Sequence, residues 1–298
     1  MTNAKSSQIK ADPKKSKKRR IVVLAVLAVL LAAAIGWIVW GNTALTISNF
    51  TVASPKLPAA FSGFRIVQVS DLHNAAFGES NEKLLAMIEE AEPDILVITG
   101  DLVDSRRTDL ETAIAFAEQA AAIVPVYYVS GNHEARIPDY DKLKQGLESA
   151  GIVILKNERI ELERSGERIA LCGLDDPSFR TDYPGGDAEN TVERSLAGFM
   201  SEDEVYTVLL AHRPEFFKLY VGYGADLVFS GHAHGGQIRL PFLGGIVAPG
   251  QGLFPKYDAG LYTQGAANMV VSRGLGNSLF PFRVNNRPEV VTVELIAE

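Results

Sequence analysis

The chain contains a short apolar run that ends in an acid and a histidine, Ile66-Val67-Gln68-Val69-Ser70-Asp71-Leu72-His73. The β-branched residues of this run favour a buried strand, which we expect over residues 64–69. Side chains alternate in direction along an extended segment, so Asp71 and His73 are expected on the same side. A carboxylate and an imidazole held side by side can bind one metal ion. The run therefore predicts a pair of metal ligands at the end of a strand.

Four more apolar runs end in polar motifs of the same kind. The runs and their motifs are Ile95-Leu96-Val97-Ile98 with Gly100-Asp101-Leu102-Val103-Asp104, Val126-Tyr127-Tyr128-Val129 with Gly131-Asn132-His133-Glu134, Val208-Leu209-Leu210 with His212, and Leu227-Val228-Phe229 with Gly231-His232-Ala233-His234. Together the motifs hold all five histidines of the chain. Ligands of open α/β sheets collect at the carboxyl ends of the strands, so we expect these side chains to converge on one rim. His232 and His234, like Asp71 and His73, could grip one ion as a pair.

Strand-like and helix-like patterns alternate along the chain, which predicts an α/β (α+β) fold. Strands are expected over residues 64–69, 94–99, 124–130, 169–173, 205–211, 225–230 and 290–295. Helices are expected over residues 81–91 and 109–122, with shorter ones over 139–150 and 214–220. Residues 175–190 are polar and contain Pro and Gly, which indicates an inserted loop, and the glycine-rich segment 235–276 predicts loops and hairpins.

The first 40 residues differ in character from the rest of the chain. Residues 1–20 contain eight Lys and Arg and one acid, a net charge of +7, and residues 21–40 contain no charge. Because the whole chain carries −7, the remainder carries −14. Twenty apolar residues in a helix can cross a bilayer core of about 30 Å. We therefore expect a basic cytoplasmic tail at 1–20, a transmembrane anchor at 21–40, a stalk and first strand at 41–60, and one domain at 61–298.

Two alternatives to an uncleaved anchor are a buried core helix and a signal peptide. A core helix should show a polar stripe, which this run lacks. A signal peptide has a shorter apolar part, and although Ala32-Ala33-Ala34 could be a cleavage site, the run continues to Trp40. The basic flank predicts a cytoplasmic N-terminus, a single crossing of the cell membrane and an extracytoplasmic domain. A domain of such acidity is not expected to bind nucleic acid, which needs a basic surface.

The order of the five motifs resembles that of the calcineurin-like metallophosphoesterase superfamily, over roughly residues 64–237. Ser272-Arg273-Gly274-Leu275-Gly276 is similar to the membrane-associated bacterial phosphoesterases within it. The resemblance implies a four-layer αββα sandwich of two mixed sheets flanked by helices. It also implies two divalent metal ions, Mn, Fe or Zn with Mn favoured. The ligands that it implies are Asp71, His73 and His234 for one ion and Asn132, His212 and His232 for the other, with Asp101 bridging both.

The same resemblance implies a membrane-anchored phosphohydrolase with a binuclear metal centre. The favoured activity is that of a phosphodiesterase on an envelope or lipid-linked phosphoester, by attack of a metal-bound hydroxide. His133 is expected to stay off the metals and to protonate the leaving oxygen, and Asp104 is expected to orient His133. A phosphomonoesterase or pyrophosphatase is the alternative within this chemistry. A non-catalytic metal-binding scaffold is the alternative from another class, and the presence of every expected ligand argues against it.

Residues outside the motifs are candidates for substrate contacts. Arg213, Arg180 and Arg273 could hold a substrate phosphate, since Arg matches phosphate with two parallel hydrogen bonds, although most arginines are surface residues. Phe242, Phe254 and Tyr257 could line a lipid-accepting face, and packing of a loop-rich subdomain is the simpler interpretation. Glu134 and Cys172 are expected to be structural.

Overall fold

The computed structural model describes residues 13–180, 187–201, 203–277 and 280–298, with the side chains of residues 13–16 left out. Most of the predicted basic tail, residues 1–12, lies outside these ranges. By its internal contacts the chain divides into two units, Met1–Trp40 and Gly41–Glu298. Helix α1 (Pro13–Thr43) occupies the first unit and its last turn begins the second.

Helix α1 is long and apolar enough over Lys17–Thr43 to cross a membrane, by length and composition. Its large apolar side chains, among them Leu24, Val29 and Ile35, are exposed. A core helix would bury such side chains, so their exposure favours the predicted anchor over a buried core helix.

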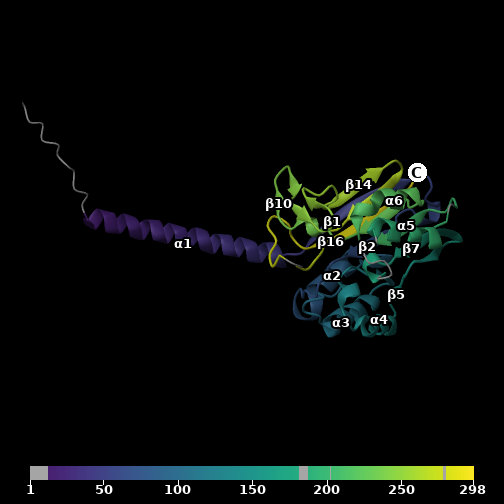
Figure 1. The fold of residues 1–298 in the computed structure, drawn as a ribbon, viewed down its shortest axis with the longest axis horizontal. Helices are drawn as coiled ribbons and strands as arrows, with labels where there is room; N and C mark the ends of the chain where they lie inside the picture. The colour runs from purple at the N-terminus through teal and green to yellow at the C-terminus, as the bar shows by residue number, and fades with distance from the viewer. Residues whose placement is uncertain (1–12, 181–186, 202, 278–279) are drawn as a thin grey trace, which may run out of the picture. The chain divides into compact units, whose positions relative to one another are not determined.

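The first six-stranded sheet combines segments that are distant in sequence, and Figure 1 shows β1, β16 and β2 lying together. Its order is β1 (Thr46–Ser54), β16 (Glu289–Ala297), β2 (Arg65–Val69), β3 (Ile95–Thr99), β4 (Val126–Val129) and β5 (Val153–Ile154). Strands β2 to β5 are parallel, β16 is antiparallel to β2, and β1 is parallel to β16. The carboxyl ends of β2, β3 and β4 therefore lie at one edge of the sheet.

The second six-stranded sheet also contains four parallel strands. Its order is β14 (Gly260–Gln264), β15 (Ala267–Val271), β9 (Leu227–Ser230), β8 (Thr207–Ala211), β7 (Glu167–Leu174) and β6 (Glu158–Arg164). Four parallel strands, β15, β9, β8 and β7, are flanked by antiparallel edge strands. Two small hairpins follow β9, formed by β10 (Arg239–Leu240) with β11 (Gly244–Gly245) and by β12 (Val247–Ala248) with β13 (Gly252–Leu253).

Helices cover the outer face of each sheet, and an apolar layer fills the space between the sheets. The helices are α2 (Glu82–Glu90), α3 (Leu110–Ala121), α4 (Tyr140–Ser149), α5 (Ala188–Phe199) and α6 (Phe217–Gly222). Ile66 and Phe229 belong to the layer between the sheets. Their strand neighbours Val67 and Val228 point outward, to the α2–α4 cluster and the α5–α6 cluster respectively. Figure 1 shows these two helix groups on opposite sides of the domain. The predicted four-layer αββα sandwich is confirmed.

Some elements differ from the expectations drawn from the sequence. Residues 267–271, expected among loops and hairpins, form the buried strand β15 of the second sheet. The predicted strand 290–295 is β16, which lies inside the first sheet between β1 and β2. The predicted loop 175–190 includes the start of α5, where the Asp187 side chain accepts the Glu189 N–H at 3.0 Å, while residues 181–186 lie outside the described residues. Strand β1 lies in the segment expected to hold a stalk and a first strand.

Candidate metal centre

The strand ends of the two sheets meet at one end of the sandwich. Strands β2, β3 and β4 of the first sheet stop just before Asp71, Asp101 and Asn132. Strands β8 and β9 of the second sheet stop just before His212 and His232. All seven candidate ligands predicted from the sequence are buried here. The expected convergence at strand ends is therefore found, with both sheets contributing.

One group of candidate ligands consists of Asp71, His73, Asp101 and His234. The Nε2 atoms of His73 and His234 face each other at 3.2 Å. Asp101 Oδ2 lies 3.6 Å from His73 Nε2, and Asp71 Oδ1 lies 3.5 Å from His234 Nε2. Two ring nitrogens and two carboxylate oxygens thus surround one small space, as a divalent ion requires.

A second group consists of Asp101, His212 and His232. His232 Nδ1 lies 3.1 Å from His212 Nε2, and Asp101 Oδ2 lies 3.3 Å from the same His212 atom. His212 Nδ1 donates to the Thr99 carbonyl at 2.7 Å, which leaves the Nε2 lone pair facing the group. The single oxygen Asp101 Oδ2 is therefore shared by both groups.

Asn132 completes the set with an oxygen that has no protein partner. Its Oδ1 atom is buried and makes no hydrogen bond among the described residues. A buried amide oxygen left unpaired is costly, and a cation would satisfy it. The donor set thus fits divalent ions that accept mixed oxygen and nitrogen ligands.

The backbone of the motifs is not extended, contrary to the expectation for Asp-x-His and His-x-His. Five candidate ligands have positive φ, namely Asp71, His73, Asp101, His232 and His234, between 47° and 65°. Non-glycine residues seldom adopt this region, and such conformations concentrate at functional sites. His232 and His234 lie in different groups, in agreement with the two ligand sets that the family resemblance implied.

Burial and neighbouring charges set the protonation of the histidines. Burial lowers the pKa of His73 and of His234 to about 3, and it lowers the pKa of His232 well below its ordinary value. Burial would also lower the pKa of His212, but the Asp101 carboxylate outweighs it and raises that pKa to about 10. Three of the four imidazoles are therefore neutral, the form that binds metal, and a metal at the second group must compete with the His212 proton.

The Glu134 side chain holds the loops that carry Asp101 and Asn132. Its carboxylate accepts the N–H groups of Asp101 at 2.9 Å, Val103 at 3.2 Å and Gly131 at 2.7 Å. The structural role expected for Glu134 is consistent with these bonds. Close backbone contact also explains Gly100, since a Cβ there would lie 2.6 Å from the Gly131 nitrogen.

His133 lies beside the first group, with its ring centre 4.4 Å from that of His73. Its Nδ1 accepts the backbone N–H of Ser105 at 3.0 Å. Asp104, expected to orient His133, lies 3.9 Å from this nitrogen, beyond hydrogen-bond distance. The Asp104 carboxylate instead accepts the backbone N–H and the guanidinium of Arg106, at 2.8, 3.3 and 3.2 Å. The backbone N–H of Ser105 thus contacts His133 Nδ1, the atom for which the sequence predicted the Asp104 carboxylate as partner.

A cavity of about 410 Å³ opens over the two groups. Its lining residues are Asp101, Ser105, Arg106, Asn132, His133, Arg136, Arg213, His232, His234, Pro249 and Gly250. Three arginines in this lining are suited to an anionic ligand. Arg213 was predicted from the sequence, and its Nε atom is held by Asp176 Oδ2 at 2.7 Å. Arg106 and Arg136 were missed, although they stand two or three residues from Asp104 and His133.

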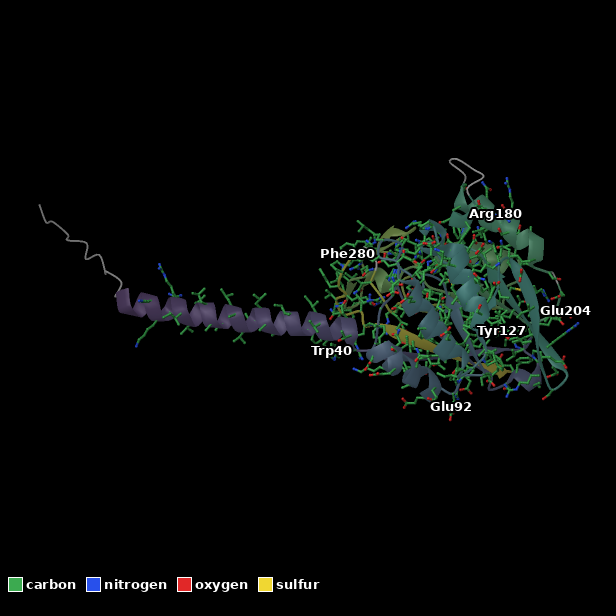
Figure 2. All side chains as sticks on the ribbon, turned by 90° about the horizontal axis from the view of Figure 1, so that it is seen from below. Trp40, Glu92, Tyr127, Arg180, Glu204 and Phe280 are labelled. Atoms are coloured by element: carbon green, nitrogen blue, oxygen red, sulfur yellow. The ribbon has the colours of Figure 1, made fainter. Side chains whose placement is uncertain are left out.

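The other two predicted arginines do not line this cavity. Arg180 is exposed and lies at the periphery of the domain in Figure 2. Arg273 Nε is bonded to Glu289 Oε2 at 2.5 Å. Closeness to a ligand motif would have been a better signal, because Arg106, Arg136 and Arg213 all lie within three residues of Asp104, His133 or His212.

The fold and the ligand cluster together define an α/β sandwich protein with a buried metal-binding site. The family model that describes calcineurin-like phosphoesterases matches residues 64–236, more than half of the chain. The chain therefore belongs to the calcineurin-like phosphoesterase family, as its motif order indicated.

Relatives come from bacteria and vertebrates. The uncharacterized metallophosphoesterase YkuE of Bacillus subtilis is 31% identical over 83% of this chain and 84% of its own length. The phosphodiesterase YaeI of Escherichia coli is 28% identical over 78% of this chain and 82% of its own length. A transmembrane protein with a metallophosphoesterase domain of Danio rerio is 32% identical over 93% of this chain, which spans 63% of that protein. A transmembrane relative and the apolar helix α1 both indicate membrane anchoring.

Proposed function

We propose that the chain is a membrane-anchored phosphohydrolase with a binuclear metal centre, most active as a phosphodiesterase. The observation that carries this proposal is the position of Asp101 Oδ2, which lies 3.6 Å from His73 Nε2 and 3.3 Å from His212 Nε2. One carboxylate oxygen facing two ligand groups suits a bridge between two cations. The family relationship and the name of the Escherichia coli relative support a phosphodiester substrate.

Asp71, His73 and His234 would hold one ion, Asn132, His212 and His232 the other, and Asp101 both. Mixed carboxylate, amide and imidazole ligands suit Mn, Fe or Zn, and we favour Mn. When bound, a pair of divalent ions polarises a phosphoryl oxygen and makes water nucleophilic near neutral pH. Asn132 contributes an oxygen with no charge, so the centre keeps a net positive charge that attracts a phosphate ester.

His133 donates a hydrogen bond to the leaving oxygen. Because Nδ1 accepts the Ser105 N–H, the proton of the neutral ring is on Nε2. The Nε2–H group can hydrogen-bond the leaving oxygen and stabilise the negative charge that develops there as its bond to phosphorus breaks. Asp104 acts as a positioning residue, since its bonds to Arg106 fix the turn that presents the Ser105 N–H. Arg213 and Arg136 are placed in the cavity lining to hold the non-bridging phosphate oxygens.

The anchor sets the class of substrate and the side of the membrane. We propose a basic cytoplasmic tail at 1–20, an anchor at 21–40 and a catalytic region at 61–298 on the extracytoplasmic side, entered through residues 41–60. An enzyme tethered in this way meets envelope phosphoesters, including lipid-linked ones. A domain with a net charge of −14 is not expected to bind nucleic acid, which needs a basic surface.

The first test is hydrolysis by the full chain in detergent. Metal-free protein should be inactive toward bis(p-nitrophenyl) phosphate and should gain activity with Mn, Fe or Zn, and a chelator should reverse the gain. Faster turnover of p-nitrophenyl phosphate would favour the phosphomonoesterase alternative. Lack of turnover with every one of these metals and both substrates would favour the non-catalytic scaffold.

The second test concerns the hydrogen bond from His133 to the leaving oxygen. His133→Ala should lower turnover about 10²–10³-fold for a phenyl leaving group. The loss should shrink for p-nitrophenyl, because a weakly basic leaving oxygen gains less from a hydrogen bond. Metal content, measured by inductively coupled plasma mass spectrometry, should stay at the wild-type value. A loss of metal, or the same loss of turnover with both leaving groups, would contradict this role.

A further inference from the structure

Six large apolar residues are exposed around the two small hairpins and the segment that follows β15. They are Phe242, Leu243, Leu253, Phe254, Phe280 and Phe282, and we call them the apolar rim. Phe242 is fully exposed, and Leu253 is 70% exposed. Exposed apolar groups of this size that lie close together indicate a contact surface. The parts of the rim are connected, because Arg239 N, in β10, donates to the Val284 carbonyl at 3.0 Å.

The backbone of the rim is strained at its two most prominent aromatics. Phe242 has φ 68° and Phe254 has φ 53°, in the left-handed region that glycine and asparagine adopt more readily. Neither ring is buried, so packing within the domain does not offset the free-energy cost of this backbone conformation. A bulky aromatic in this conformation on the surface points to something outside the domain that it contacts.

The last turn of α1, which belongs to the same unit as the domain, is hydrogen-bonded to the rim segment. Asn42 Oδ1 accepts the Arg283 N–H at 2.9 Å and an Asn277 side-chain N–H at 2.9 Å. Arg283 directly follows Phe282. The apolar run ends at Trp40, and two helical residues advance only about 3 Å. The rim segment is thus tied to the residues where the candidate membrane span, Lys17–Thr43, ends.

The two segments that carry the apolar rim contain no acidic residue. Residues 238–257 contain Arg239 and Lys256 and no acid, and residues 277–288 contain Arg283 and Arg287 and no acid. Lys256 is exposed, whereas Arg283 is buried and Arg239 pairs with Asp258 at 2.9 Å. A surface segment without acids is not repelled by the headgroup region of an anionic bilayer.

We propose that the apolar rim inserts into the bilayer that holds α1, at the boundary of the headgroups and the acyl chains. The hairpin that carries Leu253 also supplies Pro249 and Gly250 to the lining of the cavity. Insertion therefore sets one wall of the cavity at the level of the lipid headgroups. In a step that rests on the proposed function, the substrate is an amphiphilic phosphoester whose phosphate reaches the cavity while its apolar part stays in the bilayer.

Spin labels on single introduced cysteines test the contact in the full chain, reconstituted into vesicles of phosphatidylcholine and phosphatidylglycerol. Cys172 is buried and its pKa is raised to about 12, so it does not compete for the label. Labels at Leu243→Cys and Leu253→Cys should collide more with oxygen, which dissolves in the bilayer, than with a water-soluble nickel chelate. Glu204→Cys is the matched control, because Glu204 is exposed at the end of the domain away from Phe280 (Figure 2). Its label should favour the nickel chelate.

Two outcomes would overturn the proposal. Rim labels that respond to nickel as the Glu204 label does would mean that the rim lies in water. Rim labels shielded from both agents would mean that protein, such as a second copy of the chain, covers it. Neither outcome depends on catalysis, so a failure here is separate from a failure of the proposed function.

A pair of asparagine substitutions separates membrane contact from internal packing. Phe242→Asn with Phe254→Asn should keep the detergent-solubilised chain as stable to urea as wild type or more so, since asparagine tolerates positive φ. Hydrolysis of bis(p-nitrophenyl) phosphate in detergent should be unchanged. In vesicles, the labels at Leu243→Cys and Leu253→Cys on this background should move toward the nickel-accessible pattern. A loss of stability with no change in label accessibility would assign the phenylalanines to packing instead.

Discussion

At the residue scale, the centre depends on side chains that hold the loops as well as on the candidate ligands. The Glu134 carboxylate accepts three buried backbone N–H groups, two of them on Asp101 and Gly131. Ser70 has a comparable role, since its hydroxyl donates to Asp71 Oδ2 at 2.6 Å. Gly231 packs directly against this pair, and a Cβ there would overlap both Ser70 Oγ and Asp71 Oδ2. Hydrogen bonds of Ser70 and Glu134 thus fix the loops that carry the candidate ligands. The close packing at Gly231 leaves no space for a larger side chain there.

Removal of the Glu134 carboxylate should destabilise the domain strongly. Glu134→Ala leaves three buried N–H groups without an acceptor, which should lower the free energy of unfolding by about 3 kcal/mol or more. Glu134→Gln keeps one acceptor oxygen and should cost about half as much. Urea unfolding of the two variants in detergent measures the difference. Equal stability of the alanine and glutamine variants would show that these three bonds contribute little.

The sequence predicted the ligand residues better than their conformation. Asp71, His73, Asp101, His212, His232 and His234 were recognisable because each follows a β-branched run, and strand ends of both sheets do meet. Their positive φ values were not predictable, because they follow from tertiary contacts such as the Ser70 and Glu134 bonds. For the same reason, the Ser105 N–H opposite His133 Nδ1 could not be found, since a backbone donor has no signature in the sequence.

At the element scale, local signals define the helices well. Asp109 caps α3, since its Oδ1 accepts the Thr112 N–H at 3.0 Å and its Oδ2 accepts the Thr112 hydroxyl at 2.7 Å. The predicted helix 109–122 differs from α3 (Leu110–Ala121) only by its two caps. Strands that pair with distant segments are less predictable. The central place of β16 and the burial of β15 depend on pairing with β2 and β9, which no local pattern reveals.

The cap of α3 should give a pH-dependent contribution to stability. The bonds from Thr112 hold the pKa of Asp109 below its ordinary value of 3.8. The contribution is therefore complete above that value and is lost as the pH falls through the lower pKa of the folded state. Asp109→Ala should lower the free energy of unfolding by about 1 kcal/mol at neutral pH.

The control for this cap is Asp109→Asn, which can cap the helix but does not titrate. Denaturant unfolding at neutral pH should rank the asparagine variant near wild type and above the alanine variant. At acidic pH the stability of wild type relative to the asparagine variant should fall. An unchanged difference between these two proteins across the acid range would refute the pH-dependent part.

At the scale of the whole molecule, a basic segment, an apolar helix and an acidic domain follow one another along the chain. The proposed orientation places the domain outside the cytoplasm. Glu204→Cys should then react with a membrane-impermeant maleimide added to intact cells, while wild type, whose Cys172 is buried, should not. Reaction only after lysis would reverse the orientation. A cysteine introduced in the basic tail, such as Ser16→Cys, serves as the opposite control and should react only after lysis.

The central claim is that Asp101 bridges two metal ions in one centre, and counting metal ions per chain tests it most directly. Asp101→Asn keeps the Oδ1 acceptor of the His133 N–H and removes the charge. Asp104→Asn is the matched control, because Asp104 is a buried acid of the same motif that belongs to neither ligand group. Elemental analysis after Mn loading should find two ions in wild type and in Asp104→Asn, and fewer in Asp101→Asn. Two ions retained by Asp101→Asn, or only one in wild type, would contradict the account.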